Sequence, residues 1–198
     1  MPVPEVEIQG CVRSHAVLLE RTAGLTDDQV DRPSLLPDWT VGHVLTHIAR
    51  NADSVTRRLE GAARGEVVEA YPGGYEGRAA DIAAGAGRPA AEQLEDVRQS
   101  GARMEQAAHA MPEEAWEFAT RAPTGKEWPA SLLPYARWIE VETHHVDLDL
   151  GYPPATWPAE LVAQWLPGEL DRLPNRADPN ALLAWVIRRG PAPELPAW

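Results

Sequence analysis

Apolar residues recur at helical spacing in four long stretches of the chain. These stretches cover residues 6–23, about 40 into the sixties, about 89–111 and about 130–150. Apolar positions three and four residues apart are typical of amphipathic helices, and we find no alternating strand pattern of any length before residue 150. The pattern predicts a mainly all-α protein whose main domain, residues 1–150, is an antiparallel four-helix bundle.

Glycine and proline separate the predicted helices. The glycine-rich residues 71–87 form a long connection with room for a short helix at about 78–84, and a loop of this length is often functional. Beyond Gly151, two further helices are predicted over 157–170 and 179–189. We therefore expect residues 151–198 to form a small C-terminal segment after the bundle.

Charge and cysteine content narrow the class of protein. The 198 residues carry a formal net charge of −12, which disfavours binding to nucleic acid or to an anionic membrane, because both need a basic face. The single cysteine, Cys11, excludes an internal disulfide and is expected to pack in a helix. The N-terminus has no signal-peptide pattern, and no apolar run approaches 18 residues, so we expect a cytoplasmic enzyme or binding protein.

The fourth predicted helix carries a dense group of side chains that can bind metal. They are Glu140, Glu142, His144, His145 and Asp147. On a helical wheel the apolar direction is set by a group of mostly apolar side chains. These are Leu132, Tyr135, Ala136, Ile139, Thr143, Val146 and Leu150.

Glu140 and His144 fall on one flank of that apolar direction, whereas His145 points away from it. Glu142 and His145 have the i, i+3 spacing of di-iron bundles, but such sites need further carboxylates from partner helices, and the second predicted helix offers none. The wheel therefore favours Glu140 and His144 as a pair of ligands one turn apart.

The second predicted helix offers two histidines. His43 lies opposite its apolar face, whereas His47 lies on the flank, where a site between two helices would form. Together, His47, Glu140 and His144 make a set of two histidines and one carboxylate. Such a set suits catalytic zinc with an open position and also non-haem iron(II), and the spacing leaves both metals open.

Two motifs carry a resemblance to a known family. Residues 36–47 read LPDWTVGHVLTH and residues 139–148 read IEVETHHVDL, and both resemble the mycothiol-dependent maleylpyruvate isomerase family within the DinB/YfiT-like bundles. The C-terminal stretches 181–189 (ALLAWVIRR) and 195–198 (LPAW) are similar to the C-terminal part of that family. The resemblance covers most of the chain.

The resemblance implies a DinB-type bundle that binds one divalent metal, usually zinc, through His47, Glu140 and His144. His43, Glu142, His145 and Asp147 would then support the site, Asp147 by orienting an imidazole. Members of the family carry a longer C-terminal domain, so residues 151–198 resemble a shortened one. The arginine that binds a substrate carboxylate in the family corresponds to Arg188 or Arg189.

The activity that the resemblance implies is isomerisation of maleylpyruvate with the thiol mycothiol as cofactor. A thiolate adds to the activated cis double bond, the resulting single bond rotates, and elimination releases the trans product. Two alternatives remain open: a mycothiol S-transferase that conjugates an electrophile, and a non-catalytic metal-binding bundle. The expected partners are a small electrophilic substrate and a low-molecular-weight thiol, without nucleic acid or membrane, and both a monomer and a homodimer remain open.

Overall fold

The computed structural model describes residues 2–195 and divides the chain into two compact units, Met1–Thr156 and Trp157–Trp198. Residues 196–198, which the LPAW motif includes, lie outside the described residues. The helices of the first unit are α1 (Glu5–Thr22), α2 (Asp27–Val30), α3 (Val41–Ala63), α4 (Gly74–Ala86), α5 (Ala90–His109) and α6 (Leu133–Asp147). Short 3-10 turns lie at Glu113–Glu117, Ala130–Leu132 and Pro154–Thr156.

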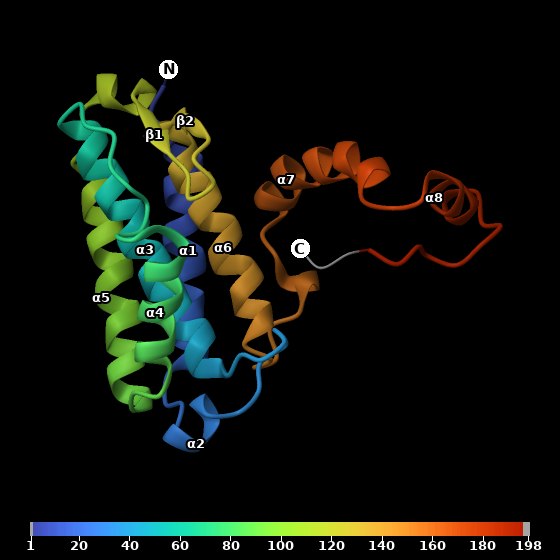
Figure 1. Ribbon diagram of the computed structural model, residues 1–198, viewed down its shortest axis with the longest axis horizontal. Coiled ribbons are helices and arrows are strands. Elements are labelled where there is room, and N and C mark those ends of the chain that lie inside the picture. The colour runs from blue at the N-terminus through green and yellow to red at the C-terminus, as the bar shows by residue number, and fades with distance from the viewer. Residues whose placement is uncertain (1, 196–198) are drawn as a thin grey trace. The chain divides into compact units, whose positions relative to one another are not determined.

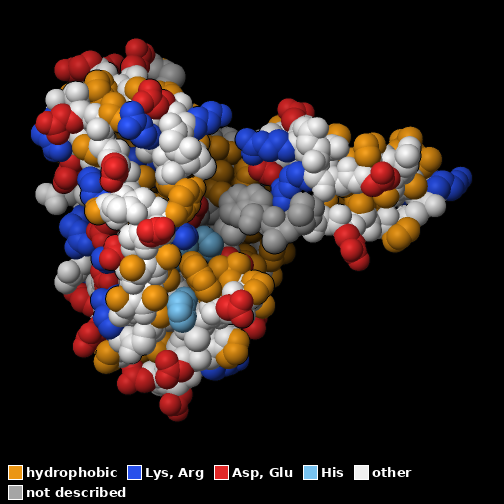
Figure 2. All heavy atoms as spheres, in the orientation of Figure 1, with side chains coloured by type: hydrophobic (Ala, Val, Ile, Leu, Met, Phe, Trp, Pro, Cys, Tyr) orange, Lys and Arg blue, Asp and Glu red, His pale blue; other side chains and the backbone are white. Residues whose placement is uncertain are grey.

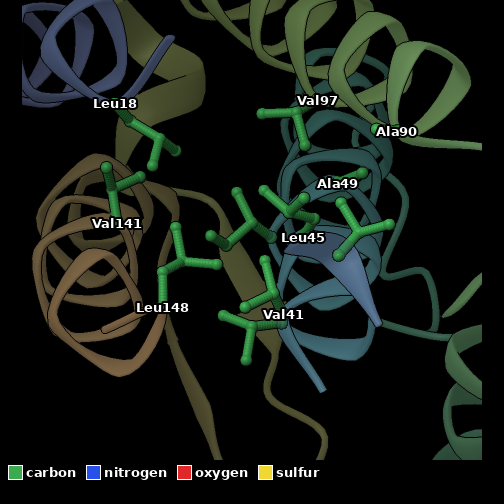
Figure 3. Packing of buried hydrophobic residues seen from close by; sticks show 11 residues of the cluster. Leu18, Val41, Leu45, Ala49, Ala90, Val97, Val141 and Leu148 are labelled. Carbon is green, nitrogen blue, oxygen red and sulfur yellow. The ribbon is translucent and has the colours of Figure 1, made fainter. Parts of the chain in front are cut away.

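Helices α1, α3, α5 and α6 form a four-helix bundle, as the apolar pattern predicts (Figure 1). Helix α4 runs back along α3, so α3 and α5 point in the same direction, and α1 and α6 point the opposite way. Figure 3 shows the centre of the bundle, where Leu18 of α1, Leu45 of α3, Val97 of α5 and Val141 of α6 meet. Burying such side chains stabilises the fold by roughly 1.5–3 kcal/mol each.

Helix α3 begins at a capping box that involves one of the candidate histidines. The Thr40 hydroxyl accepts a hydrogen bond from the backbone N–H of His43, and the ring Nδ1 of His43 accepts one from the backbone N–H of Thr40 at 3.2 Å. Both groups satisfy backbone donors that a helix start would otherwise leave unpaired. The box fixes where α3 starts, and therefore where His47 lies one turn later.

The glycine-rich connection is more ordered than the sequence pattern predicts. A 13-residue helix, α4, occupies Gly74–Ala86 where we expected mainly a loop. Gly73 and Gly74 reach this helix with φ values of 73° and 65°, a left-handed conformation that L side chains rarely adopt. A Cβ at Gly42 of α3 would lie only 2.2 Å from the carbonyl oxygen of Ala86, so α4 packs closely against α3.

The bundle unit also contains a small hairpin that the sequence pattern does not predict. Strand β1 (Ala119–Arg121) pairs antiparallel with β2 (Glu127–Pro129), and Gly125 turns between them with a φ of 83°. Each strand has three residues, which is too short to show an alternating pattern. The expectation of no strands before residue 150 is therefore wrong for this short stretch.

The buried face of α6 lies on the side opposite to the predicted apolar direction. Its buried side chains are Leu133, Pro134, Arg137, Trp138, Val141, Glu142 and His145. Leu132 is exposed, and Ile139, Thr143 and Val146 are only half-buried. The wheel failed because polar residues on the buried face bind partners from other parts of the chain, as Arg137 binds Ile48 and Asn51. A hydropathy pattern places such polar residues in solvent.

The C-terminal unit contains helices α7 (Ala159–Arg172) and α8 (Pro179–Val186), joined by a 3-10 turn at Leu173–Asn175. The side chain of Asp178 caps α8 by accepting a hydrogen bond from the backbone N–H of Ala181. In the described part of this unit, Leu161 is the one fully buried hydrophobic side chain. No helix among the described residues is long and apolar enough to cross a membrane.

Candidate metal centre

The three predicted ligands converge from two helices. His47 lies on α3, and Glu140 and His144 lie one turn apart on α6. The Nε2 atom of His47 is 3.1 Å from Oε2 of Glu140 and 2.9 Å from Nε2 of His144, and those last two atoms are 3.4 Å apart. One ligand atom from each residue thus lies within 4.8 Å of the other two.

This spacing fits a single metal ion. Zinc bonds to nitrogen and oxygen of about 2.0–2.2 Å give ligand atoms about 3.3–3.6 Å apart in a tetrahedral site. The observed separations of 2.9–3.4 Å are close to that range. Two imidazoles and one carboxylate also match the donor sets of catalytic zinc and non-haem iron. The residues therefore fit the ion that the sequence predicts.

The protonation states of His47 and Glu140 suit metal binding. Burial lowers the pKa of His47 to about 4, despite the hydrogen bond with Glu140, so the imidazole is neutral near pH 7. Burial opposes ionisation of Glu140, but hydrogen bonds with His144 and His47 outweigh it and hold its carboxyl pKa well below the usual range. The pair therefore presents one neutral nitrogen ligand and one anionic oxygen ligand.

Asp147 contacts the imidazole of His144, the ring that the sequence predicts it to orient. Its Oδ2 lies 2.8 Å from Nδ1 of His144, the ring nitrogen that faces away from the cluster. Burial opposes protonation of His144, but the hydrogen bonds with Asp147 and Glu140 raise its pKa. A carboxylate on Nδ1 holds a proton there and leaves the Nε2 lone pair free for a metal.

Other residues of the 36–47 motif shape the surroundings of His47. Trp39 contacts the edge of the His47 ring at a centroid distance of 5.7 Å and stacks on His43 at 6.0 Å. His43 is committed to the capping box of α3 and is not part of the ligand cluster.

Arg78 of α4 also contacts this cluster, and the sequence analysis missed it. Its Nη2 lies 3.1 Å from Nδ1 of His47, and its guanidinium lies over the ring of Tyr71 at 5.8 Å. Arg78 is the one basic residue in the Gly- and Ala-rich sequence of α4, and this isolated charge is the signal that could have drawn attention to it.

Figure 2 shows histidine side chains reaching the surface of the bundle.

Glu142 and His145 lie on the other side of α6 and form a separate, internal polar network. Glu142 accepts hydrogen bonds from the Ser14 hydroxyl and, at 2.6 Å, from the Tyr152 hydroxyl. The ring of His145 stacks on Tyr152 at a centroid distance of 3.7 Å. Burial raises the pKa of Glu142 and lowers that of His145 to about 4, so the imidazole of His145 is neutral near pH 7. They are not brought to the ligand cluster.

The two arginines proposed for substrate binding lie in the C-terminal unit. Helix α8 ends at Val186, three residues before the predicted end, and Arg188 follows with a φ of 59°. Both Arg188 and Arg189 are exposed. Their assignment to a substrate carboxylate stays a prediction.

A family model described as the mycothiol maleylpyruvate isomerase N-terminal domain matches residues 11–149. The crystal structure of the mycothiol-dependent maleylpyruvate isomerase is similar, with a TM-score of 0.77 and 24% sequence identity. The match covers 82% of this chain and 67% of that chain. No protein with a curated description matches the sequence.

A second fold relative is YfiT from Bacillus subtilis, described as a probable metal-dependent hydrolase with an unusual four-helix bundle topology. Its TM-score is 0.58 at 18% identity, and the match covers 82% of this chain and 87% of that chain. The predicted DinB/YfiT-like four-helix bundle is confirmed.

Proposed function

Because the chain belongs to the mycothiol maleylpyruvate isomerase N-terminal domain family, we propose that it is a zinc- and mycothiol-dependent isomerase of the maleylpyruvate isomerase type. The observation that carries this proposal is the cluster of His47, Glu140 and His144, whose ligand atoms lie within 4.8 Å of one another. In this proposal residues 1–150 form the metal-binding bundle, and residues 151–198 form a separate C-terminal segment.

His47, Glu140 and His144 would hold the metal. A zinc ion bound there supplies positive charge that lowers the pKa of a bound thiol, so that a thiolate is available near neutral pH. The chain prepares this state, because His47 is neutral and Glu140 is ionised near pH 7. Asp147 keeps the proton of His144 on Nδ1, away from the cluster.

The reacting thiol must come from another molecule. Cys11 is the protein's single cysteine, and it is fully buried in the bundle core. Burial raises the pKa of its thiol to about 11, so almost none of it is ionised near pH 7. A nucleophilic sulfur at the cluster therefore requires an external thiol, which supports mycothiol as cofactor.

Substrate binding completes the proposal. Addition of a thiolate to an activated cis double bond allows rotation about the resulting single bond, and elimination gives the trans isomer and returns the thiol. We propose that Arg188 or Arg189 binds a carboxylate of the substrate through paired hydrogen bonds.

The test is to supply the purified, zinc-loaded protein with mycothiol and maleylpyruvate. We expect conversion of the cis to the trans isomer, with dependence on both zinc and thiol and without net consumption of thiol. A stable thiol adduct would instead indicate a mycothiol S-transferase. If the protein holds stoichiometric metal but shows no thiol-dependent reaction, the result would indicate a non-catalytic metal-binding bundle. If the protein holds no metal, the result would contradict all three functions.

A further inference from the structure

Arg78 is the cation nearest to the candidate metal centre on the bundle unit, and the proposed reaction gives it no role. Its guanidinium Nη2 lies 3.1 Å from Nδ1 and 3.5 Å from Nε2 of His47. The side chain is half-buried and therefore reachable from solvent. It is held against the ring of Tyr71, which is itself buried.

Three other arginines of the bundle differ from Arg78, because each of them pairs with a carboxylate. Arg50 and Arg88 both pair with Asp96 at 2.6 Å, and Arg103 pairs with Asp53 at 2.7 Å. Within residues 2–195, Arg78 forms no ion pair with a carboxylate. A guanidinium has five N–H donors in a planar fork that matches a carboxylate, so Arg78 has unused donors beside the cluster.

The hydrogen bond between Arg78 and His47 is not compatible with a metal on His47. A neutral imidazole that binds metal through Nε2 carries its proton on Nδ1. Arg78 can only donate, so it cannot hydrogen-bond to a protonated Nδ1. When the centre is loaded, the guanidinium therefore needs a different acceptor close to its present place.

The fold keeps Arg78 near the centre whether or not it bonds to His47. Gly73 and Gly74 turn the chain into α4, and Gly77 approaches the carbonyl oxygen of Pro72 so closely that a Cβ would lie 1.9 Å from it. At the other end of α4, the side-chain amide of Gln93 donates to the carbonyl oxygen of Ala86 at 2.9 Å. Arg78 thus projects from a helix fixed at both ends.

We propose that Arg78 binds a carboxylate of the electrophilic substrate beside the metal centre and so selects anionic substrates. This inference rests on the proposed function and assigns to it a substrate-binding residue on the bundle itself. It also gives the bundle an anion-binding residue of its own.

The test measures binding of maleate, a stable cis-dicarboxylate, to the zinc-loaded full-length protein by calorimetry. We expect Arg78→Met to weaken maleate binding about tenfold or more, because a charged hydrogen-bond partner is lost. The control Arg64→Met removes an exposed arginine that pairs with Glu66 at 2.9 Å, and it should leave maleate binding unchanged. The neutral dimethyl ester of maleate should bind both variants as it binds the original protein.

Zinc content, measured by elemental analysis, should be the same in all variants. Unchanged maleate binding in zinc-loaded Arg78→Met would overturn the inference, as would failure of the original protein to bind maleate. Loss of zinc in Arg78→Met would also overturn it, because Arg78 would then support the metal centre itself. Arg78→Gln is a second neutral variant if Arg78→Met does not fold.

The same samples separate this inference from the proposed function. The original protein could react with a neutral electrophile in a thiol-dependent way while Arg78→Met binds maleate as well as the original protein does. That result would refute only the carboxylate site. Absence of zinc from the original protein would refute the proposed function. Weaker mycothiol binding without weaker maleate binding in Arg78→Met would assign Arg78 to the cofactor and overturn the inference.

Discussion

Helix α6 carries two glutamate–histidine pairs on opposite sides, and their surroundings differ. Glu140 and His144 are partly exposed, at 29% and 12%, and their free ligand atoms point to one place beside His47. Glu142 and His145 are almost fully buried, and Glu142 is bonded to Ser14 and Tyr152. The same residue types thus form an accessible group of donors on one side and a closed polar network on the other.

The comparison shows that residue type does not distinguish a ligand from a structural residue. A metal ion is favoured where the lone pairs of several side chains point to one place and a carboxylate holds the second ring nitrogen of an imidazole ligand. Lone pairs already bonded to hydroxyl groups inside the protein leave nothing for a ligand. Substitutions on the two sides should therefore change different properties.

The largest expected effect is on the accessible side. His47→Ala removes one of three ligands, so we expect loss of stoichiometric zinc and a fall in thiol-dependent turnover of more than about a hundredfold, beyond the effect typical of outer-shell partners. Helical circular dichroism should remain, because the hydrophobic core cluster of the bundle does not include His47. Elemental analysis and activity assays measure both outcomes. Full zinc content in this variant would refute the ligand set.

A smaller effect on the same side is expected from Asp147→Asn. An amide can place its oxygen or its NH₂ group toward Nδ1 of His144 and no longer fixes the proton there. We expect zinc affinity to fall about 10–100-fold with stability nearly unchanged. Competition with a coloured chelator measures this affinity. An affinity equal to that of the original protein would show that Asp147 does not orient the ligand.

On the buried side, Tyr152→Phe keeps the ring stacked on His145 but removes the hydroxyl that donates to Glu142 at 2.6 Å. We expect a loss of about 1 kcal/mol in the free energy of unfolding, the usual net value of one hydrogen bond. Zinc content should not change. Urea denaturation gives the first quantity and elemental analysis the second, and loss of zinc here would mean that the two sides are coupled.

The smallest effect is a difference in pH dependence, measured on the metal-free protein. Burial raises the pKa of Glu142, so its stabilising contribution is present below the unfolded pKa of about 4.3 and is lost as pH rises through the folded pKa. The lowered pKa of Glu140 has the opposite sign: its contribution is present above that unfolded value and is lost as pH falls.

Substitution by glutamine should separate these two signs. Glu142→Gln should flatten the decrease in stability on the alkaline side, and Glu140→Gln should flatten the decrease on the acid side. The midpoint of urea unfolding, followed from acid to neutral pH, measures both. Shifts of the same sign in the two variants would contradict the assigned environments.

Sequence reasoning identified the bundle and the three converging residues, but its argument for them was partly wrong. Glu140 and His144 lie between the predicted and the observed buried faces of α6, so a reversed face still left them on a flank. The wheel could not find the true face, because Arg137 is buried by donating to the carbonyl oxygen of Ile48 and to Asn51, contacts between distant parts of the chain. Local hydropathy contains no information about such partners.

The full length of helix α4 and the contact of Arg78 with His47 were missed for a different reason. Glycine and alanine dominate this stretch, and glycine weakens helices in isolation by about 1 kcal/mol each. Here the glycines allow close packing on α3, as at Gly85, where a Cβ would lie 2.5 Å from the Thr46 side chain. Tertiary contact thus overrides local propensity, and only the folded chain brings Arg78 to His47.

The ligand cluster joins residues that are far apart in the order of synthesis. His47 and Glu140 are separated by 93 positions, and His47 and His144 by 97. At about 5–20 residues per second, a ribosome needs about 5–20 seconds to add the intervening segment. During that interval His47 has no co-ligands, so the ion can enter the complete centre only after α6 has been made and has docked on α3. If the chain binds metal as proposed, we therefore expect metal loading only after the synthesis of α6 is complete.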